Sequence, residues 1–220
     1  METTAEFLQR MDGVLKETLK GVPRKQLIQE NKERLKKLET ITGTYDKEKD
    51  VDNSEISEGF FCNYLTLKGF EIIKCNTKQK TKDSHVLDVI ARKSEKDYSF
   101  ELKTDFKFKT TGNIGLEYAK ETENGVLDSG IFTSNADYVV YLIPHANCLV
   151  FFKRELLIKY MQGRIQTEEK PWVPGGDDKK FRIMLFKINK HKGNNVDPVE
   201  VELDIKYVDQ RVPKTRIEYL

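Results

Sequence analysis

Residues 86–90 read Val-Leu-Asp-Val-Ile and residues 99–103 read Ser-Phe-Glu-Leu-Lys, and these two stretches decide the predicted fold and site. Each is an apolar run typical of a β-strand, interrupted by one acidic residue. Because burying an unpaired carboxylate is costly, we expect Asp88 and Glu101 to have a cationic partner or to face a cleft. Alternation along a strand places Glu101 and Lys103 on one face, and pairing of the two strands would bring Asp88 beside Glu101. Two carboxylates and an ammonium in this arrangement suit a divalent cation and a positioned water.

The triplet of an acidic residue, any residue and Lys is not rare in a chain of which 34% is charged. Only Glu101 and Asp204 begin such a triplet inside a predicted strand, and only Glu101 follows a strand-borne Asp at a short distance. A structural salt bridge from Lys103 to Asp88 or Glu101 is the alternative to a catalytic site. Triplets outside the predicted strands begin at Glu30, Asp105, Glu168, Asp177 and Asp178.

The order Asp88, then Glu101-Leu102-Lys103, resembles the PD-(D/E)xK nuclease superfamily, with Leu87 in place of the Pro. The resemblance covers residues of about 54–152 and implies a restriction-endonuclease-like core with a Mg²⁺- or Mn²⁺-dependent nuclease site. It implies that Asp88, Glu101 and the Leu102 carbonyl hold the metal, and that Lys103 orients or helps to deprotonate the attacking water. The family usually adds an acidic residue from a preceding helix, for which Glu58 is favoured over Glu55.

Residues 112–118 and 129–138 resemble phage-type nucleases of this superfamily. In these, a strand ends in an acidic residue, here Glu117, and a Ser-Gly-(Ile/Leu)-x-Thr turn precedes an Asp-Tyr strand. This resemblance assigns Glu117 a role beside the metal or the water, although Glu117 is equally suited to pair with Lys103. Ser129 and Thr133 offer hydroxyls, and the backbone amides of the turn offer donors, for a phosphate. Asp137 is expected to cap the start of the next strand.

Positive charge is concentrated around the two motifs. Residues 68–109 contain eleven Lys or Arg and seven Asp or Glu, a local excess of +4 in a chain whose formal net charge is +2. Lysines in the flanking loops are therefore predicted to hold nucleic-acid phosphates on both sides of a scissile bond, with solvated loop lysines as the alternative. The lysines in question are Lys78, Lys80, Lys82, Lys107 and Lys109.

Hydrophobic periodicity predicts an α/β (α+β) fold with a mixed central sheet flanked by helices. Residues 1–50 are expected to form a charged helical hairpin, packed on the main domain or on a second copy of the chain, with residues 42–52 as a linker. Residues 51–220 are expected to form the nuclease-like domain, with a core at about 54–165 and a C-terminal strand extension at 166–220. The capping-box sequence at 52–55 predicts a helix from Ser54 to about Lys68. Strands are expected at 70–75, 85–91, 98–103, 114–118, 138–143, 148–152, 181–188 and 199–207, and a helix at 155–162.

Composition narrows the class of protein. No window of the 220 residues is long and apolar enough to span a membrane, and the N-terminus has no signal-peptide pattern. Three widely spaced cysteines form no disulfide framework, so an intracellular location and small core thiols are expected. The expected partner is DNA, with RNA possible, and a homodimer could form through the N-terminal helices. The alternatives are a non-catalytic nucleic-acid-binding or assembly module on the same fold and an RNA endonuclease.

Overall fold

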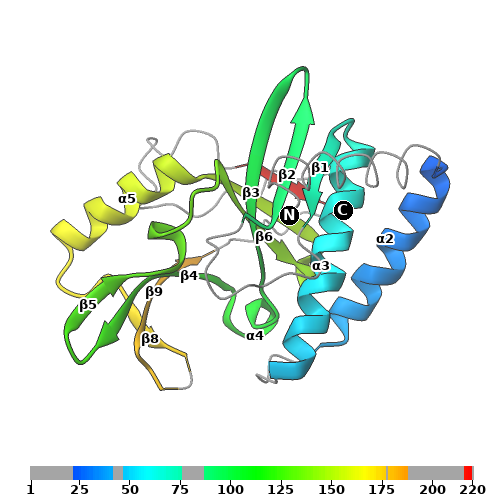
Figure 1. Cartoon of the computed structure of the whole chain (residues 1–220). Helices are drawn as coiled ribbons and strands as arrows, with labels where there is room; N and C mark the ends of the chain where they lie inside the picture. Colours follow the sequence, from blue (N-terminus) through cyan, green and yellow to red (C-terminus); the bar gives the residue numbers. More distant parts are fainter. Residues whose placement is uncertain (1–21, 42–46, 76–86, 177, 188–215, 220) are drawn as a thin grey trace, which may run out of the picture.

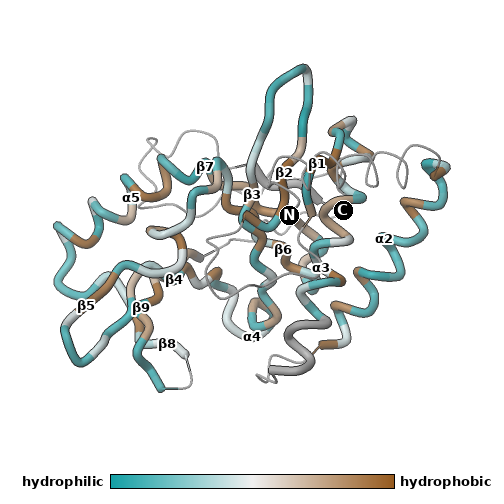
Figure 2. The backbone as a smooth tube through the Cα atoms, viewed as in Figure 1, coloured by the Kyte–Doolittle hydropathy of each residue, from teal (hydrophilic) through white to brown (hydrophobic). Residues whose placement is uncertain are grey.

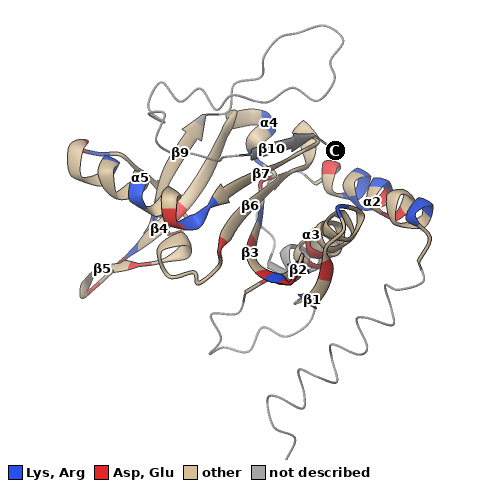
Figure 3. Cartoon of the chain, turned by 90° about the horizontal axis from the view of Figure 1, so that it is seen from above, with Lys and Arg blue, Asp and Glu red and all other residues tan. Residues whose placement is uncertain are grey.

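The computed structural model describes residues 22–41, 47–75, 87–176, 178–187 and 216–219, and Figure 1 shows how their elements are arranged. Two helices, α2 (Arg24–Glu39) and α3 (Lys47–Leu67), lie side by side at one end of the molecule. The inner side of α2 is fixed to α3 by Asn31 Nδ2, which donates to the Phe60 carbonyl at 3.2 Å, and by Arg34, which donates to the Gly59 carbonyl at 3.0 Å. Figure 3 shows basic and acidic residues along α2, so this helix contributes a charged surface.

Of the hairpin predicted for residues 1–50, the second helix is observed as α2, and it packs on α3. The predicted first helix, within residues 1–21, lies outside the described residues, so the hairpin itself stays a prediction. The predicted start at Ser54 is wrong, because α3 begins at Lys47 and includes most of the predicted linker. The Ser57 hydroxyl donates to the Asn53 carbonyl at 2.8 Å, a bond of the kind formed inside a helix.

A six-stranded mixed sheet forms the centre of the molecule, with strand order β1-β2-β3-β6-β7-β10. Its third strand, β3, runs parallel to β6, and the other neighbours are antiparallel. Phe61 of α3 packs edge-on against Phe100 of β3, so α3 covers one face of this sheet. The strands are β1 (Glu71–Cys75), β2 (Val89–Lys93), β3 (Lys96–Thr104), β6 (Tyr138–Ile143), β7 (Cys148–Lys153) and β10 (Arg216–Tyr219).

A second, antiparallel sheet of four strands, in the order β5-β4-β9-β8, lies on the other side of β6 and β7. Its β4 contributes Ile114 and Leu116 to a core that also holds Tyr141 of β6 and Met161 of α5. Figure 2 shows apolar residues concentrated in the inner strands and polar residues along the outer edges. The elements are β4 (Asn113–Thr122), β5 (Gly125–Asp128), β8 (Val173–Gly175), β9 (Phe181–Lys187), α4 (Phe108–Thr111), α5 (Arg154–Thr167) and the 3₁₀ helices η1 (Gly130–Phe132) and η2 (Pro144–Ala146).

The mixed α/β class predicted from the sequence is confirmed, and so is the strand at residues 138–143. The division of the strands into two sheets was not predicted. The expected boundary at residue 50 falls within α3, and Leu38 of α2 is buried in the same cluster as Phe60 and Phe61. The predicted strand at 199–207 lies outside the described residues. No helix in the described part of the chain has the length and apolar character needed to cross a membrane.

Candidate functional site

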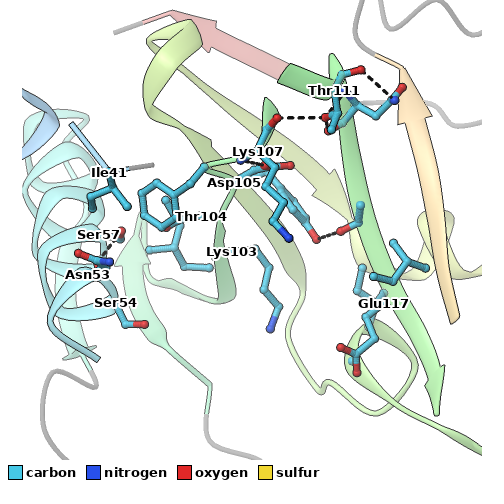
Figure 4. A pocket seen from close by; sticks show the side chains of 18 of the residues that line it. Ile41, Asn53, Ser54, Ser57, Lys103, Thr104, Asp105, Lys107, Thr111 and Glu117 are labelled. Carbon is cyan, nitrogen blue, oxygen red and sulfur yellow. Dashed lines mark hydrogen bonds between the residues drawn. The ribbon is translucent and has the colours of Figure 1, made fainter. Parts of the chain in front are cut away.

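A cleft of about 700 Å³ opens between α3, the C-terminal end of β3 and the second sheet. In Figure 4, Lys103 points into this cleft, between Ser54 on α3 and Glu117 on β4. One wall is polar and comes from α3, and the opposite wall is apolar and comes from β8 and β9. The lining includes Asn53, Ser54, Ser57 and Glu58 of α3, Asp88, residues 102–107, Asn113, Gly115, Glu117, Gly130, Tyr141, Val173, Ile183 and Leu185.

Asp88 lies in this cleft immediately before β2, rather than within a strand as its apolar neighbours predicted. Because β2 and β3 pair antiparallel with Val89 opposite Phe100, the next position along β3 comes level with Asp88. The Asp88 carboxylate accepts a hydrogen bond from the backbone N–H of Leu102 at 2.8 Å. Asp88 is thereby held against the residue that separates Glu101 from Lys103.

Glu101 and Lys103 lie on the same face of β3, as strand alternation requires. The Lys103 ammonium contacts Glu101 Oε1 at 2.5 Å, and the two side chains are 42% and 14% exposed, respectively. Burial alone would lower the pKa of Lys103, but the carboxylate of Glu101, followed by those of Asp88 and Glu117, raises it above the usual lysine value. Three carboxylates from three parts of the chain thus act on one ammonium group. This Lys103–Glu101 ion pair is one of the contacts that the salt-bridge alternative expects.

Glu117, predicted as a site residue, lines the cleft from β4 of the second sheet, and the sequence did not indicate that a second sheet would carry it. It precedes a register irregularity in the pairing of β4 with β9. The Ser129 hydroxyl donates to Glu117 Oε1 at 2.5 Å, and the Ser129 backbone N–H donates to the Tyr118 carbonyl at 2.9 Å. The next residue, Gly130, has φ of 52°, and a Cβ there would overlap the Glu117 carbonyl oxygen. The Ser-Gly turn therefore packs directly on Glu117 and orients its carboxylate.

The turn itself is fixed by Arg154, at the start of α5. Its guanidinium donates to the carbonyls of Ile131 and Phe132, both at 3.0 Å. The Thr133 hydroxyl donates to the Gly130 carbonyl at 3.1 Å. The hydroxyls of Ser129 and Thr133, predicted to bind phosphate, thus have partners within the protein, and their contact with a phosphate stays a prediction.

Glu58 lines the cleft from α3 with only 6% of its surface exposed, whereas Glu55 is half-buried and does not line it. Within the described ranges, no three His, Cys, Asp or Glu side chains are grouped closely enough to hold a metal ion. The donor chemistry nevertheless fits a hard cation, because Asp88, Glu58 and Glu117 all present carboxylates to one cleft. Glu101 is not among the residues that line the cleft, but its carboxylate contacts the ammonium of Lys103, which does line it.

The predicted phosphate-binding lysines are only partly described. Lys107 is exposed and lines the cleft, and Lys109 is exposed on α4. Lys78, Lys80 and Lys82 lie outside the described residues. Asp137, expected as a strand cap, accepts hydrogen bonds from the backbone N–H and the hydroxyl of Ser99, at 2.9 and 2.8 Å.

Two residues of the cleft were missed from the sequence. Asp105 accepts hydrogen bonds from the backbone N–H groups of Lys107 and Phe108, at 2.8 and 2.9 Å, yet burial raises its pKa above the usual aspartate value. Tyr141 donates to the Gly115 carbonyl at 2.8 Å and so links the two sheets. Continuing the alternation from Glu101 through Lys103 would have indicated Asp105, but nothing in the apolar run around Tyr141 marks it as a cleft residue.

Comparisons of the chain with protein-family models, with curated proteins and with solved structures found no match. The geometry of the cleft therefore carries the functional argument.

Proposed function

We propose that the chain is a metal-dependent endonuclease that hydrolyses phosphodiester bonds in DNA, on a restriction-endonuclease-like core. The observation that carries the proposal is the Lys103 ammonium, which lies in a cleft under the influence of the carboxylates of Glu101, Asp88 and Glu117. A helix ahead of the sheet, an acidic residue before β2 and the acidic-x-Lys triplet on β3 follow the order of elements that the family resemblance implies.

Asp88 and Glu101 would hold Mg²⁺ or Mn²⁺, with the Leu102 carbonyl as a further oxygen ligand and Glu58 or Glu117 completing the set. When bound, such an ion lowers the pKa of a water molecule and neutralises charge on the phosphate. The Leu102 N–H keeps Asp88 beside Glu101, and the Ser129 hydroxyl holds the Glu117 carboxylate at the cleft wall.

Lys103 has two tasks in this mechanism. Its raised pKa keeps the amine protonated at neutral pH, so it supplies positive charge where charge develops on the phosphoryl oxygens. It also orients the attacking water by donating a hydrogen bond. Lys107, exposed at the rim of the same cleft, holds a neighbouring phosphate without contacting a base.

A cleavage assay tests the proposal. The protein is incubated with linear, supercoiled, single-stranded and branched DNA and with RNA, in Mg²⁺, Mn²⁺ or EDTA. Cleavage of DNA that requires a metal ion and is abolished in Lys103→Met and Asp88→Asn supports it. Lys159→Met and Asp128→Asn are matched controls, because both side chains are exposed, on α5 and β5, and neither lines the cleft. Full activity in Lys103→Met would exclude the assigned site.

The same assay separates the competing functions. Metal-independent, salt-sensitive DNA binding without cleavage would favour a binding or assembly module, in which the Lys103–Glu101 ion pair is structural. Cleavage confined to RNA would favour an RNA endonuclease.

A further inference from the structure

Two cysteines that lie far apart in the sequence are in contact behind the cleft. The Cys62 thiol, on α3, donates to the sulfur of Cys75, at the end of β1, with the two sulfur atoms 2.7 Å apart. Both are present as thiols. Cys62 is buried with 6% of its surface exposed, whereas Cys75 is half-buried. An oxidant in solution therefore has better access to Cys75.

The position of the pair connects it to the candidate site. Cys62 lies one helical turn after Glu58 on α3. Cys75 pairs across the sheet with Val89, the residue after Asp88. A bond between the two sulfurs would join the helix that carries Glu58 to the pair of strands β1 and β2, which Asp88 immediately precedes.

We propose that Cys62 and Cys75 form an oxidisable pair, which hydrogen peroxide or a related hydroperoxide converts to an intramolecular disulfide. The thiols already touch in the reduced protein, so the elements need to move little for the bond to form. Oxidation then fixes α3 to β1 in the arrangement that the reduced protein already has. The proposal does not depend on nuclease activity.

The reaction proceeds in two balanced steps. The Cys75 thiolate attacks one peroxide oxygen, the O–O bond breaks, and the leaving hydroxide takes up a proton to give water and a Cys75 sulfenic acid. The Cys62 sulfur then attacks the Cys75 sulfur as its proton is lost, the S–O bond breaks, and a second water leaves. Two thiols are oxidised by two electrons, and one peroxide is reduced to two waters.

The order of the steps follows from the surroundings of the two sulfurs. The hydrogen bond to Cys75 contributes most to raising the pKa of Cys62, followed by burial and then by the charges of Cys75 and Glu58. Cys62 is therefore a poor first nucleophile, because the thiolate is the reactive form. It is placed to resolve a sulfenic acid formed on Cys75.

The test uses the full chain, fully reduced and then exposed to hydrogen peroxide. Thiols are counted by maleimide labelling under denaturing conditions, and the product is analysed by intact mass and peptide mapping. We expect the mass to fall by two hydrogen atoms, a linked peptide containing residues 62 and 75, and reversal by dithiothreitol. Cys148, buried on β7, is expected to keep its thiol and serves as the internal reference.

Single variants make the result decisive. Cys62→Ala is expected to leave a Cys75 sulfenic acid that dimedone traps, Cys75→Ala to remain reduced, and Cys148→Ala to oxidise like the natural chain. The proposal would be overturned if the natural chain kept all three thiols at a peroxide concentration that oxidises Cys75 in Cys62→Ala. A disulfide that includes Cys148 would overturn it as well. If Cys62→Ala does not fold, the linkage map of Cys148→Ala decides alone.

A second measurement follows the effect on the fold. Closing the loop between residues 62 and 75 restricts the unfolded chain, so the oxidised protein is expected to melt about 5 °C higher than the reduced one. Oxidised Cys75→Ala, treated in parallel, should show no rise. An oxidised protein that carries the mapped linkage and melts lower than the reduced one would contradict the idea that the disulfide fits the existing arrangement.

Discussion

The Asp88 carboxylate accepts a hydrogen bond from the backbone N–H of Leu102 at 2.8 Å, although Asp88 lies one residue before the start of β2. The backbone pairing of β2 with β3 ends with Val89 opposite Phe100. The side chain of Asp88 therefore extends the pairing by one step and keeps a carboxylate beside Glu101 and Lys103. The same contact gives Asp88 a structural role in addition to the proposed catalytic one, and substitutions can separate the two.

We expect Asp88→Ala to lower the free energy of unfolding by about 1–3 kcal/mol, because the Leu102 N–H loses its acceptor. Asp88→Asn retains an acceptor oxygen and is expected to stay within about 1 kcal/mol of the natural chain. Urea unfolding at pH 7 measures both. Equal destabilisation by the two substitutions would show that the charge of Asp88, and not this hydrogen bond, stabilises the fold.

Lys103→Met is expected to change the response of stability to alkaline pH. The neighbouring carboxylates raise the pKa of Lys103 in the folded protein, so its favourable contribution is complete below the usual lysine value and is lost as the pH rises through the folded value. The natural chain should therefore lose stability between neutral pH and pH of about 11 more steeply than Lys103→Met. Urea unfolding across this range tests it, with Lys159→Met as control, and parallel curves for Lys103→Met and the natural chain would contradict the expectation.

Ser129→Ala is expected to release the Glu117 carboxylate. Loss of a hydrogen bond to a charged group should lower the free energy of unfolding by about 1.5 kcal/mol. If Glu117 serves the proposed site, the metal concentration needed for half-maximal cleavage should rise about 10-fold or more. Ser129→Thr is the matched control, because threonine keeps the hydroxyl and adopts the extended backbone of this position (φ of −149°). A loss of stability without any change in metal dependence would leave Ser129 with a structural role only.

The sequence predicted the strands of the site better than their assembly. Alternation placed Glu101 and Lys103 on one face, and the apolar run at 138–143 is a strand with its predicted bounds. The capping-box prediction failed because residues 47–53 are helix-compatible and α3 extends through them. The family resemblance placed Glu117 near Lys103, but local periodicity cannot indicate which sheet a strand joins, so the approach of Glu117 from a second sheet was not predicted. The links of Tyr141 to Gly115 and of Cys62 to Cys75 arise only from tertiary packing.

Tyr141→Phe tests the link between the two sheets. The hydroxyl of Tyr141, which is 5% exposed, donates to the Gly115 carbonyl, so its removal leaves a β4 carbonyl without this donor. We expect the free energy of unfolding to fall by about 1 kcal/mol, measured by urea unfolding at pH 7. Tyr98→Phe, whose partly buried ring lies on β3, is the control. A Tyr141→Phe protein as stable as the natural chain would mean that the hydrogen bond adds nothing to the packing of the aromatic ring.

Asp105→Asn is expected to stabilise the protein at neutral pH. Burial raises the pKa of Asp105 in spite of the hydrogen bonds from Lys107 and Phe108, so the folded state binds this proton more tightly than the unfolded state does. The contribution of Asp105 is therefore most favourable below the usual aspartate pKa of about 3.9 and is lost as the pH rises through the folded value. Asparagine keeps an oxygen that can accept both backbone N–H groups and carries no charge to bury. Urea unfolding from pH 4 to pH 7 tests this, with the exposed Asp128→Asn as control. The free energy of unfolding of Asp105→Asn should exceed that of the natural chain by an amount that grows with pH, and Asp128→Asn should show no such trend. A difference that shrinks with rising pH would reverse the assigned sign.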